Sequence, residues 1–119
     1  MADMLTVYGI KQCDTVRKAL KWLDQQGIEH RFHDFRSDGL QIELLRNWQD
    51  SDFSDKLVNR RSTTWRQLSD VQKQSEGEAL LELLLQFPTL IKRPVMVTDR
   101  IIAIGFSPKE LESNMAGKA

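Results

Sequence analysis

The stretch that most constrains this chain is Tyr8–Lys18, where a short apolar strand gives way to a helix around the only cysteine. Leu5–Tyr8 is predicted as a strand that ends at Gly9, and from Asp14 onward the apolar residues follow helical spacing. Cys13 therefore lies at the predicted helix start, where unsatisfied N–H groups and the helix dipole amount to about half a positive charge. Those groups stabilise a thiolate, so we predict a reactive cysteine. The alternative is a small buried hydrophobe.

Length and composition narrow the class of protein. The chain has 119 residues, 40% hydrophobic and 29% charged, as expected of one globular domain with its own core. Because 17 basic residues balance 17 acidic ones, we expect no direct binding to nucleic acid or to a membrane surface. We find no signal-peptide pattern and no apolar run near the roughly 20 residues that span a bilayer. A single cysteine forms no internal disulfide, and we expect a cytoplasmic protein.

We predict no metal site. His30 and His33 are spaced i, i+3 in a predicted strand, which points them to different faces. No thiolate pair or acidic cluster completes a tetrahedral ligand set around them. We interpret both as ordinary, partly exposed histidines.

The first third of the chain predicts a βαβ unit. Residues 5–8 and 28–35 have strand character, and the segment between Asp14 and Gly27 is an amphipathic helix. A crossover helix makes its two strands parallel, and the start of the helix then faces the carboxyl ends of the strands. Open α/β sheets bind ligands at that edge, where Cys13 is expected.

The middle of the chain, residues 38–88, is predicted as a helical insertion without a strand. Within it, Ser75-Glu76-Gly77-Glu78 is predicted as a capping box that starts a leucine-rich helix. Residues 95–97 and 101–104 then read as a hairpin, and Ser107 as the N-cap of a short final helix.

Together these elements predict an α/β, thioredoxin-like fold with a four-stranded mixed sheet. We expect a single domain over residues 1–119. Its thioredoxin-like parts cover about 1–37 and 89–119, and the insertion covers about 38–88. A reactive cysteine after the first strand is where such a fold would place it.

Two other places in the chain carry residues that would suit a reactive cysteine. Pro94 precedes the third strand, and an X–Pro bond at a tight entry is where a cis peptide costs only about 0.5–1 kcal/mol. A cis turn would aim Arg93 at the loop that holds Cys13. The alternative is a plain strand-breaking proline beside a solvated arginine. Arg60 and Arg61 lie in a region without strong periodicity, where adjacent arginines usually form a solvated face. Arginine also binds oxyanions and carboxylates in a bidentate manner and favours a nearby thiolate.

The chain resembles the arsenate reductase (ArsC) family, in its YffB branch, which is related to the Spx and MgsR regulators. The resemblance implies the thioredoxin-like fold with a helical insert. It rests on five blocks, which are Tyr8–Ala19, Phe32–Arg36, Asn59–Arg66, Pro88–Pro94 and Ile104–Phe106.

The resemblance also implies roles for single residues. Cys13 corresponds to the catalytic thiol of the arsenate reductases, and Arg93 to one of their oxyanion-binding arginines, with Pro94 as the adjacent cis proline. Arg61 is preferred over Arg60 as the mid-chain arginine, because the Arg-Arg-Ser sequence here matches the Thr-Arg-Ser pattern of the regulators.

The chain departs from its relatives in two respects. Arsenate reductases carry an arginine after the glycine of the last strand, and here Phe106 follows Gly105. One of three cationic groups expected around the oxyanion is therefore missing, which argues against arsenate reduction. The Cys-x-x-Cys switch of the regulators is also absent, because Val16 stands three residues after Cys13.

We therefore expect a thiol reductase that uses glutathione. The thiolate would attack a sulfur or an oxidised atom, and an external thiol, glutathione or a glutaredoxin-type donor, would resolve the adduct because no second cysteine exists. No bound cofactor is expected. Arg61 and Arg93 would hold the glutathione carboxylates or an anionic substrate, and backbone N–H groups of Cys13, Asp14 and Thr15 would help. Lys11 is a further candidate cation, with a surface role as the alternative.

Two other functions stay open. The first is arsenate reduction with glutathione or glutaredoxin, which the fold and two arginines favour. The second is a non-enzymatic regulator that binds RNA polymerase, for which the helical insertion would be the partner surface.

Overall fold

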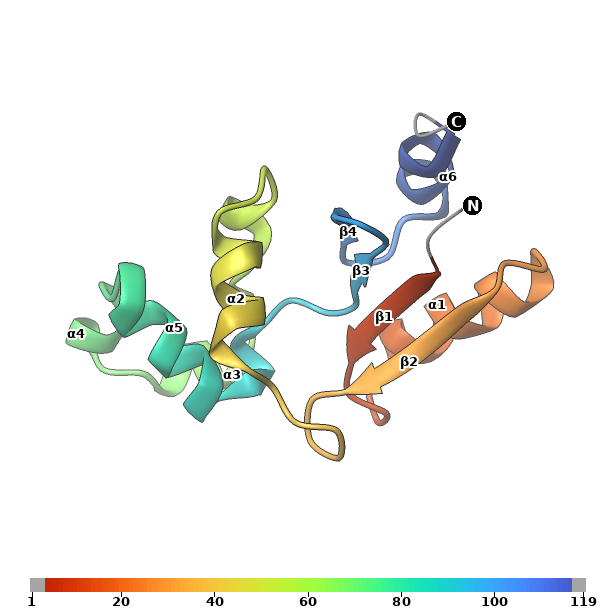
Figure 1. Ribbon diagram of the computed structural model, residues 1–119. Coiled ribbons are helices and arrows are strands. Elements are labelled where there is room, and N and C mark those ends of the chain that lie inside the picture. Colours follow the sequence, from red (N-terminus) through yellow and green to blue (C-terminus); the bar gives the residue numbers. More distant parts are fainter. Residues whose placement is uncertain (1–3, 117–119) are drawn as a thin grey trace. The chain divides into compact units, whose positions relative to one another are not determined.

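The computed structural model describes residues 4–116, which divide into two compact units. One unit comprises residues 4–39 and 93–116, and the other comprises residues 40–92 (Figure 1). The first unit holds all four strands of a mixed sheet, which confirms the predicted fold class. The second unit is helical.

The sheet has the strand order β2-β1-β3-β4. β1 (Leu5–Gly9) pairs in parallel with β2 (His30–Asp34) and antiparallel with β3 (Val95–Val97), which pairs antiparallel with β4 (Ile101–Ile104). Parallel neighbours need a crossover, and α1 (Asp14–Gln25) supplies it. The βαβ unit and the hairpin are therefore present as predicted.

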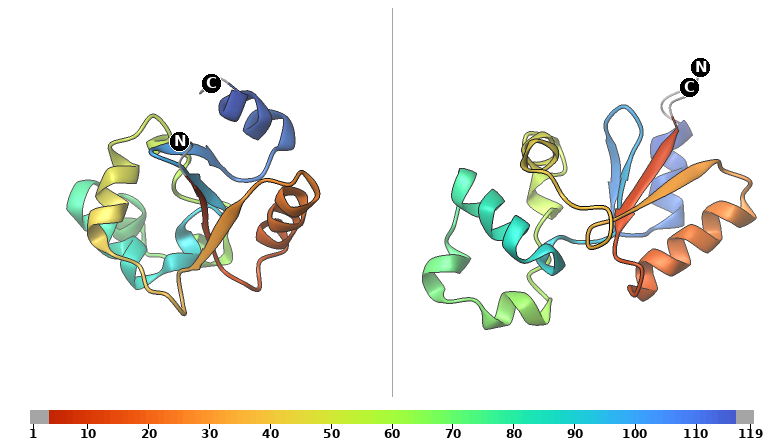
Figure 2. Two further views of the ribbon diagram at one scale, coloured as in Figure 1. Left: turned by 45° about the vertical axis from the view of Figure 1, so that its right-hand side comes forward. Right: turned by 60° about the horizontal axis from the view of Figure 1, so that its bottom comes forward.

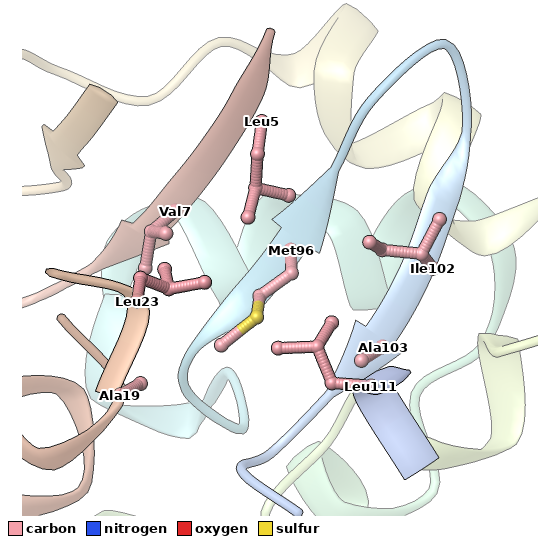
Figure 3. Packing of buried hydrophobic residues seen from close by; sticks show 8 residues of the cluster. All are labelled: Leu5, Val7, Ala19, Leu23, Met96, Ile102, Ala103 and Leu111. Carbon is pink, nitrogen blue, oxygen red and sulfur yellow. The ribbon is translucent and has the colours of Figure 1, made fainter. Parts of the chain in front are cut away.

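The core of this unit lies between one face of the sheet and two helices, α1 and α6 (Pro108–Ala116). Figure 2 shows both helices on the same side of the sheet. The helical spacing of the apolar residues in α1 explains its placement, because Val16, Ala19 and Leu23 are all fully buried. Figure 3 shows the packed cluster, which consists of Leu5, Val7, Ala19, Leu23, Met96, Ile102, Ala103 and Leu111.

The second unit is built of short helices. Its longest two, α2 (Ile42–Gln49) and α5 (Gly77–Gln86), are joined by an ion pair of 2.7 Å between Arg46 and Glu78. The other elements are η1 (Ser54–Lys56), α3 (Thr63–Gln67), α4 (Asp70–Lys73) and η2 (Pro88–Leu90). Among residues 4–116, no helix is both long enough and apolar enough to cross a membrane.

The helix starts confirm one predicted cap and correct another. The N–H of Glu110 donates to Ser107 Oγ at 3.3 Å, so Ser107 caps α6 as predicted. The capping box predicted from Ser75 is wrong, because α5 begins after Glu76, which makes no side-chain cap. Gly77 has φ +56°, a left-handed conformation that a right-handed turn starting at Ser75 could not contain. A capping box forms instead at Ser69, the N-cap of α4.

Gly9 lets the end of β1 approach the first turn of α1 closely. A Cβ atom built on Gly9 would lie 2.7 Å from Cγ2 of Val16, closer than carbon atoms pack. Val16 is fully buried and cannot move aside into solvent. The absence of a side chain at Gly9 therefore allows β1 to lie this close to the helix that begins after Cys13.

We predict that Gly9→Ala lowers the free energy of unfolding by about 1–3 kcal/mol, because the added methyl overpacks the contact with Val16. Val16→Ala removes buried methyl groups and is destabilising by itself. Since the smaller side chain removes the clash, the double variant should be more stable than the sum of the two losses predicts, by about 0.5–3 kcal/mol. Denaturant unfolding of the four proteins measures this coupling, and strict additivity would contradict the contact.

Candidate functional site

Cys13 ends a tight turn that joins β1 to α1. Its N–H donates to the carbonyl oxygen of Ile10 at 3.0 Å, and its own carbonyl oxygen accepts from the N–H of Arg17 at 3.0 Å. No non-glycine residue among those described has a positive φ, so the turn over residues 10–13 is of type I. The turn delivers Cys13, which is partly buried, to the N-cap position of α1.

The surroundings of Cys13 stabilise its thiolate. Burial raises the pKa of the thiol, but the N–H of Val16, the hydrogen bond and charge of Arg93, and the N–H of Thr15 outweigh burial and hold that pKa below its ordinary value. The neutral thiol is a weak acceptor and closes no capping hydrogen bond. The N–H groups therefore act mainly on the charge of the ionised sulfur, and they increase the thiolate fraction at neutral pH.

Arg93 reaches Cys13 from the segment before β3. The Arg93–Pro94 peptide bond is cis, as the family resemblance implies, and the Pro94 carbonyl oxygen accepts from the N–H of Gly105 at 2.8 Å. The Nε and Nη1 atoms of Arg93 are buried and have no hydrogen-bond acceptor. Buried donors without a partner are rare in proteins, and a carboxylate or another oxyanion would satisfy both.

The other predicted residues of this loop are engaged differently. The carboxylate of Asp14 accepts a hydrogen bond from Arg17 at 3.2 Å, and both side chains are exposed, so this pair adds little stability. The N–H of Cys13, predicted to help bind an anion, donates instead to the carbonyl oxygen of Ile10. The N–H of Thr15 stabilises the Cys13 thiolate. The side chain of Lys11 is exposed.

Arg60 and Arg61 belong to the second unit. The guanidinium of Arg60 lies over the ring of Trp65, 5.7 Å from its centre, which is within cation–π range. The backbone N–H of Arg61 donates to Oδ1 of Asn59 at 3.1 Å, and Arg61 is exposed. Of these two arginines, Arg60 is the one that contacts an aromatic ring. The role of Arg61 in binding glutathione or an anionic substrate stays a prediction.

Phe106 occupies the position at which the resemblance places an arginine. Its ring packs edge-on against Trp22 of α1, with ring centres 6.0 Å apart and planes inclined by 63°. Both rings lie against the hydrophobic core of the unit. An apolar contact therefore takes the place of a cation here.

Sequence reasoning missed Asp34, the last residue of β2. Its side chain is only 8% exposed, and Oδ2 accepts a hydrogen bond from the backbone N–H of Lys11 at 3.1 Å. It is thereby joined to the turn that ends at Cys13. A charged residue at the carboxyl end of a predicted strand was the available signal, because ligand sites of α/β sheets gather there.

The two histidines are bonded to backbone groups. His30 Nδ1 lies 2.8 Å from the carbonyl oxygen of Ile28, and His33 Nε2 lies 2.7 Å from that of Gly39. Within residues 4–116, no three side chains of His, Cys, Asp and Glu gather closely enough to hold a metal ion.

Comparison with known sequences identifies relatives along nearly the whole chain. A family model described as the ArsC family matches residues 8–114. An uncharacterised protein of Haemophilus influenzae is 49% identical over 95% of this chain and 100% of its own length. The regulatory protein MgsR of Bacillus subtilis is 32% identical over 93% of this chain and 90% of its own length.

Solved structures agree with the fold. A YffB protein superposes with a TM-score of 0.84 at 37% identity, covering 93% of this chain and 98% of that one. An arsenate reductase (ArsC) related protein from Brucella melitensis superposes with a TM-score of 0.75 at 38% identity, covering 92% of each chain. The similarity thus includes proteins named for arsenate reduction and proteins named for regulation.

We predict that Arg93→Met makes Cys13 less acidic, because the variant loses both the hydrogen bond and the charge that favour the thiolate. The rate of alkylation of Cys13 by iodoacetamide, measured against pH, should therefore shift its midpoint to higher pH. Arg100→Met removes the same charge from an exposed position in the β3–β4 turn and serves as the control. Equal shifts in the two variants would show that net charge alone, and not contact with the sulfur, sets the acidity.

Proposed function

The chain belongs to the ArsC family, and we propose that it is a thiol oxidoreductase in which Cys13 is the nucleophile and glutathione the resolving thiol. The observation that carries this proposal is the position of Cys13 at the N-cap of α1, beside Arg93, whose Nε and Nη1 are buried without an acceptor. Arg93 and the N–H groups of Thr15 and Val16 lower the pKa of the thiol there. A thiolate is the reactive form of cysteine, and such an environment distinguishes a reactive cysteine from an inert buried one.

The proposed reaction has two thiol–disulfide exchange steps. The Cys13 thiolate attacks one sulfur of a disulfide substrate, the S–S bond of the substrate breaks as a bond to the Cys13 sulfur forms, and the other half of the substrate leaves as a thiolate. One glutathione thiolate then attacks a sulfur of this mixed disulfide, which restores the Cys13 thiolate and releases a disulfide. Each step exchanges one S–S bond for another, so the half of the substrate that leaves first is reduced to a thiolate and one glutathione is oxidised into the released disulfide. Because Cys13 is the only cysteine, the second step needs an external thiol.

The N–H donors of Arg93 that lack an acceptor favour the binding of an anionic ligand next to the sulfur. Two of its nitrogens are buried without an acceptor, and glutathione carries two carboxylates that could fill them. Phe106 lies against Trp22, where arsenate reductases would add a cation, so the site is poorer in positive charge than an arsenate site requires. We therefore favour a sulfur substrate over arsenate. Glutathione is kept reduced in the cytoplasm, and we propose that location.

A regulatory role is the second candidate function, because the regulator MgsR is 32% identical over most of the chain. In that case the helical unit of residues 40–92 would bind a protein partner, with RNA polymerase as the first partner to test. Cys13→Ser separates the two functions. Loss of thiol chemistry with retained partner binding would favour regulation, whereas loss of every activity would favour the enzyme.

We predict that incubation with oxidised glutathione adds one glutathionyl group to the protein and that reduced glutathione removes it. Intact-mass spectrometry measures both steps, and Cys13→Ser should show neither. Arg93→Met should slow the addition by about 10–100-fold, because a hydrogen bond to a charged group contributes about 1.5–3 kcal/mol. Arg100→Met is again the matched control and should react at the wild-type rate. A protein that stays unmodified while Cys13 still alkylates rapidly would rule out glutathione as the resolving thiol.

A further inference from the structure

Asp34 is a charged side chain that the proposed chemistry leaves unexplained. Among the residues whose burial the structure describes, Asp34 is the one polar or charged residue that is buried, with 8% of its surface exposed. A carboxylate removed from water is costly unless it is hydrogen-bonded or paired with a cation. No ion pair to Asp34 closes within the described part of the chain. Backbone N–H groups must therefore stabilise its charge.

Three backbone N–H groups donate to this carboxylate. Oδ1 accepts from Arg36 at 2.7 Å and from Ser37 at 3.4 Å, which closes the turn after β2. Oδ2 accepts from Lys11 at 3.1 Å, across 23 residues of sequence. Burial raises the pKa of Asp34, but these N–H groups and the charge of Arg36 outweigh it and hold the pKa below its usual value. The carboxylate therefore stays ionised near neutral pH, as an acceptor only.

The bond to Lys11 fixes the turn that carries Cys13. Lys11 is the second residue of the type I turn over residues 10–13, and its N–H points away from the hydrogen bond that closes the turn between Cys13 and Ile10. The carbonyl oxygen of Lys11 accepts from Nε of Arg17 at 3.2 Å. Both backbone groups of Lys11 are thus held by side chains, one from β2 and one from α1.

We propose that Asp34 is a positioning residue whose carboxylate holds the turn before Cys13 in the geometry in which Arg93 and the start of α1 stabilise the sulfur anion. This rests on the proposed function of Cys13 as the nucleophile. Asp34 acts through the backbone of Lys11, two residues before the sulfur.

The charge of Asp34 and its positioning role have opposite effects on Cys13. A negative charge near the sulfur disfavours a second negative charge, so removing it would by itself lower the pKa of the thiol. Loosening the turn would weaken the stabilising contacts of Cys13 and raise that pKa. The direction of change in an uncharged variant therefore shows which effect dominates.

Several other charged groups lie near Asp34. A cavity of about 470 Å³ lies beside it, onto which Lys11 and Arg17 bring positive charge and Asp34 and Asp38 negative charge. Arg36 acts on the carboxylate from the following turn. Asp38 is the matched control, because its Oδ2 accepts from the N–H of Asp34 at 2.9 Å, whereas the hydrogen bond to the turn before Cys13 comes from Asp34. An asparagine at position 38 can keep that bond through its carbonyl oxygen.

The test compares Asp34→Asn with Asp38→Asn by the pH dependence of Cys13 alkylation. Asparagine keeps the size of the side chain but has only one acceptor oxygen, so it cannot serve both the turn after β2 and the N–H of Lys11. We expect Asp34→Asn to move the midpoint to higher pH, and Asp38→Asn to leave it unchanged or to lower it. A lower or unchanged midpoint in Asp34→Asn would overturn the proposal.

A rescue variant separates positioning from any other effect. Proline has no N–H and presets the φ that the second position of a type I turn requires. Lys11→Pro in the Asp34→Asn protein should therefore bring the midpoint back toward the wild-type value, although it also removes a positive charge. Lys11→Met in the same protein removes the charge without fixing the turn and should not restore the midpoint. Rescue by both substitutions, or by neither, would contradict positioning.

A measurement on the wild-type protein covers the case in which Asp34→Asn does not fold. The amide proton of Lys11 should exchange with solvent more slowly than that of Gln12 in the same turn, because Asp34 accepts it. Equal exchange rates would overturn the proposal.

The proposed function can fail independently of the positioning role. It fails if Cys13 of the wild-type protein titrates as an ordinary thiol. If the pKa of Cys13 is lowered in the wild-type protein but Asp34→Asn does not raise it, only the positioning role of Asp34 is contradicted, and the proposed function stands.

Discussion

The interaction on which the rest of this site depends is the contact of the Cys13 sulfur with Arg93 and with the first N–H groups of α1. Each partner is held by a different part of the first unit. The start of α1 is set against β1 through the close approach of Val16 to Gly9. Arg93 is set by the segment before β3, whose Pro94 carbonyl is bonded to the loop after β4. The sheet thus brings together residues that are 80 positions apart in sequence, and the acidity of the thiol follows from that arrangement.

Much of the fold could be predicted because its signals are local. The alternation and spacing of apolar residues identified the strands and α1, and Ser107 with Pro108 identified the start of α6. The wrong prediction, the capping box at Ser75, also has a local cause. Ser75 and Glu78 have the spacing of a capping box, but the left-handed conformation of Gly77 between them interrupts the turn. Glycine adopts left-handed and right-handed backbone conformations about equally readily, so the sequence pattern does not predict which of them Gly77 has.

The candidate site could be predicted only where one residue carried its own signal. Cys13 stands out because it is the only cysteine and lies at a helix start, and the family resemblance added Arg93. The role of Asp34 could not be predicted, because its partner is a backbone N–H, which every residue except proline possesses, 23 positions away. The sequence shows that Phe106 stands where the resemblance places an arginine, but only the structure shows that its ring packs on Trp22. Together these residues describe a thiolate supported by one arginine and by backbone N–H groups, with an aromatic contact where the resemblance places a further arginine.

The most direct test of this account is the ultraviolet absorbance of the thiolate, followed against pH in the unmodified protein. Because Cys13 is the only cysteine, the thiol part of the titration belongs to that residue alone. Cys13→Ser supplies the baseline for tyrosine ionisation. Because Arg93 and the start of α1 stabilise the thiolate, we expect a midpoint clearly below the value of about 8.5 for a free thiol. A midpoint at or above that value would show that Arg93 and the start of α1 do not activate the sulfur.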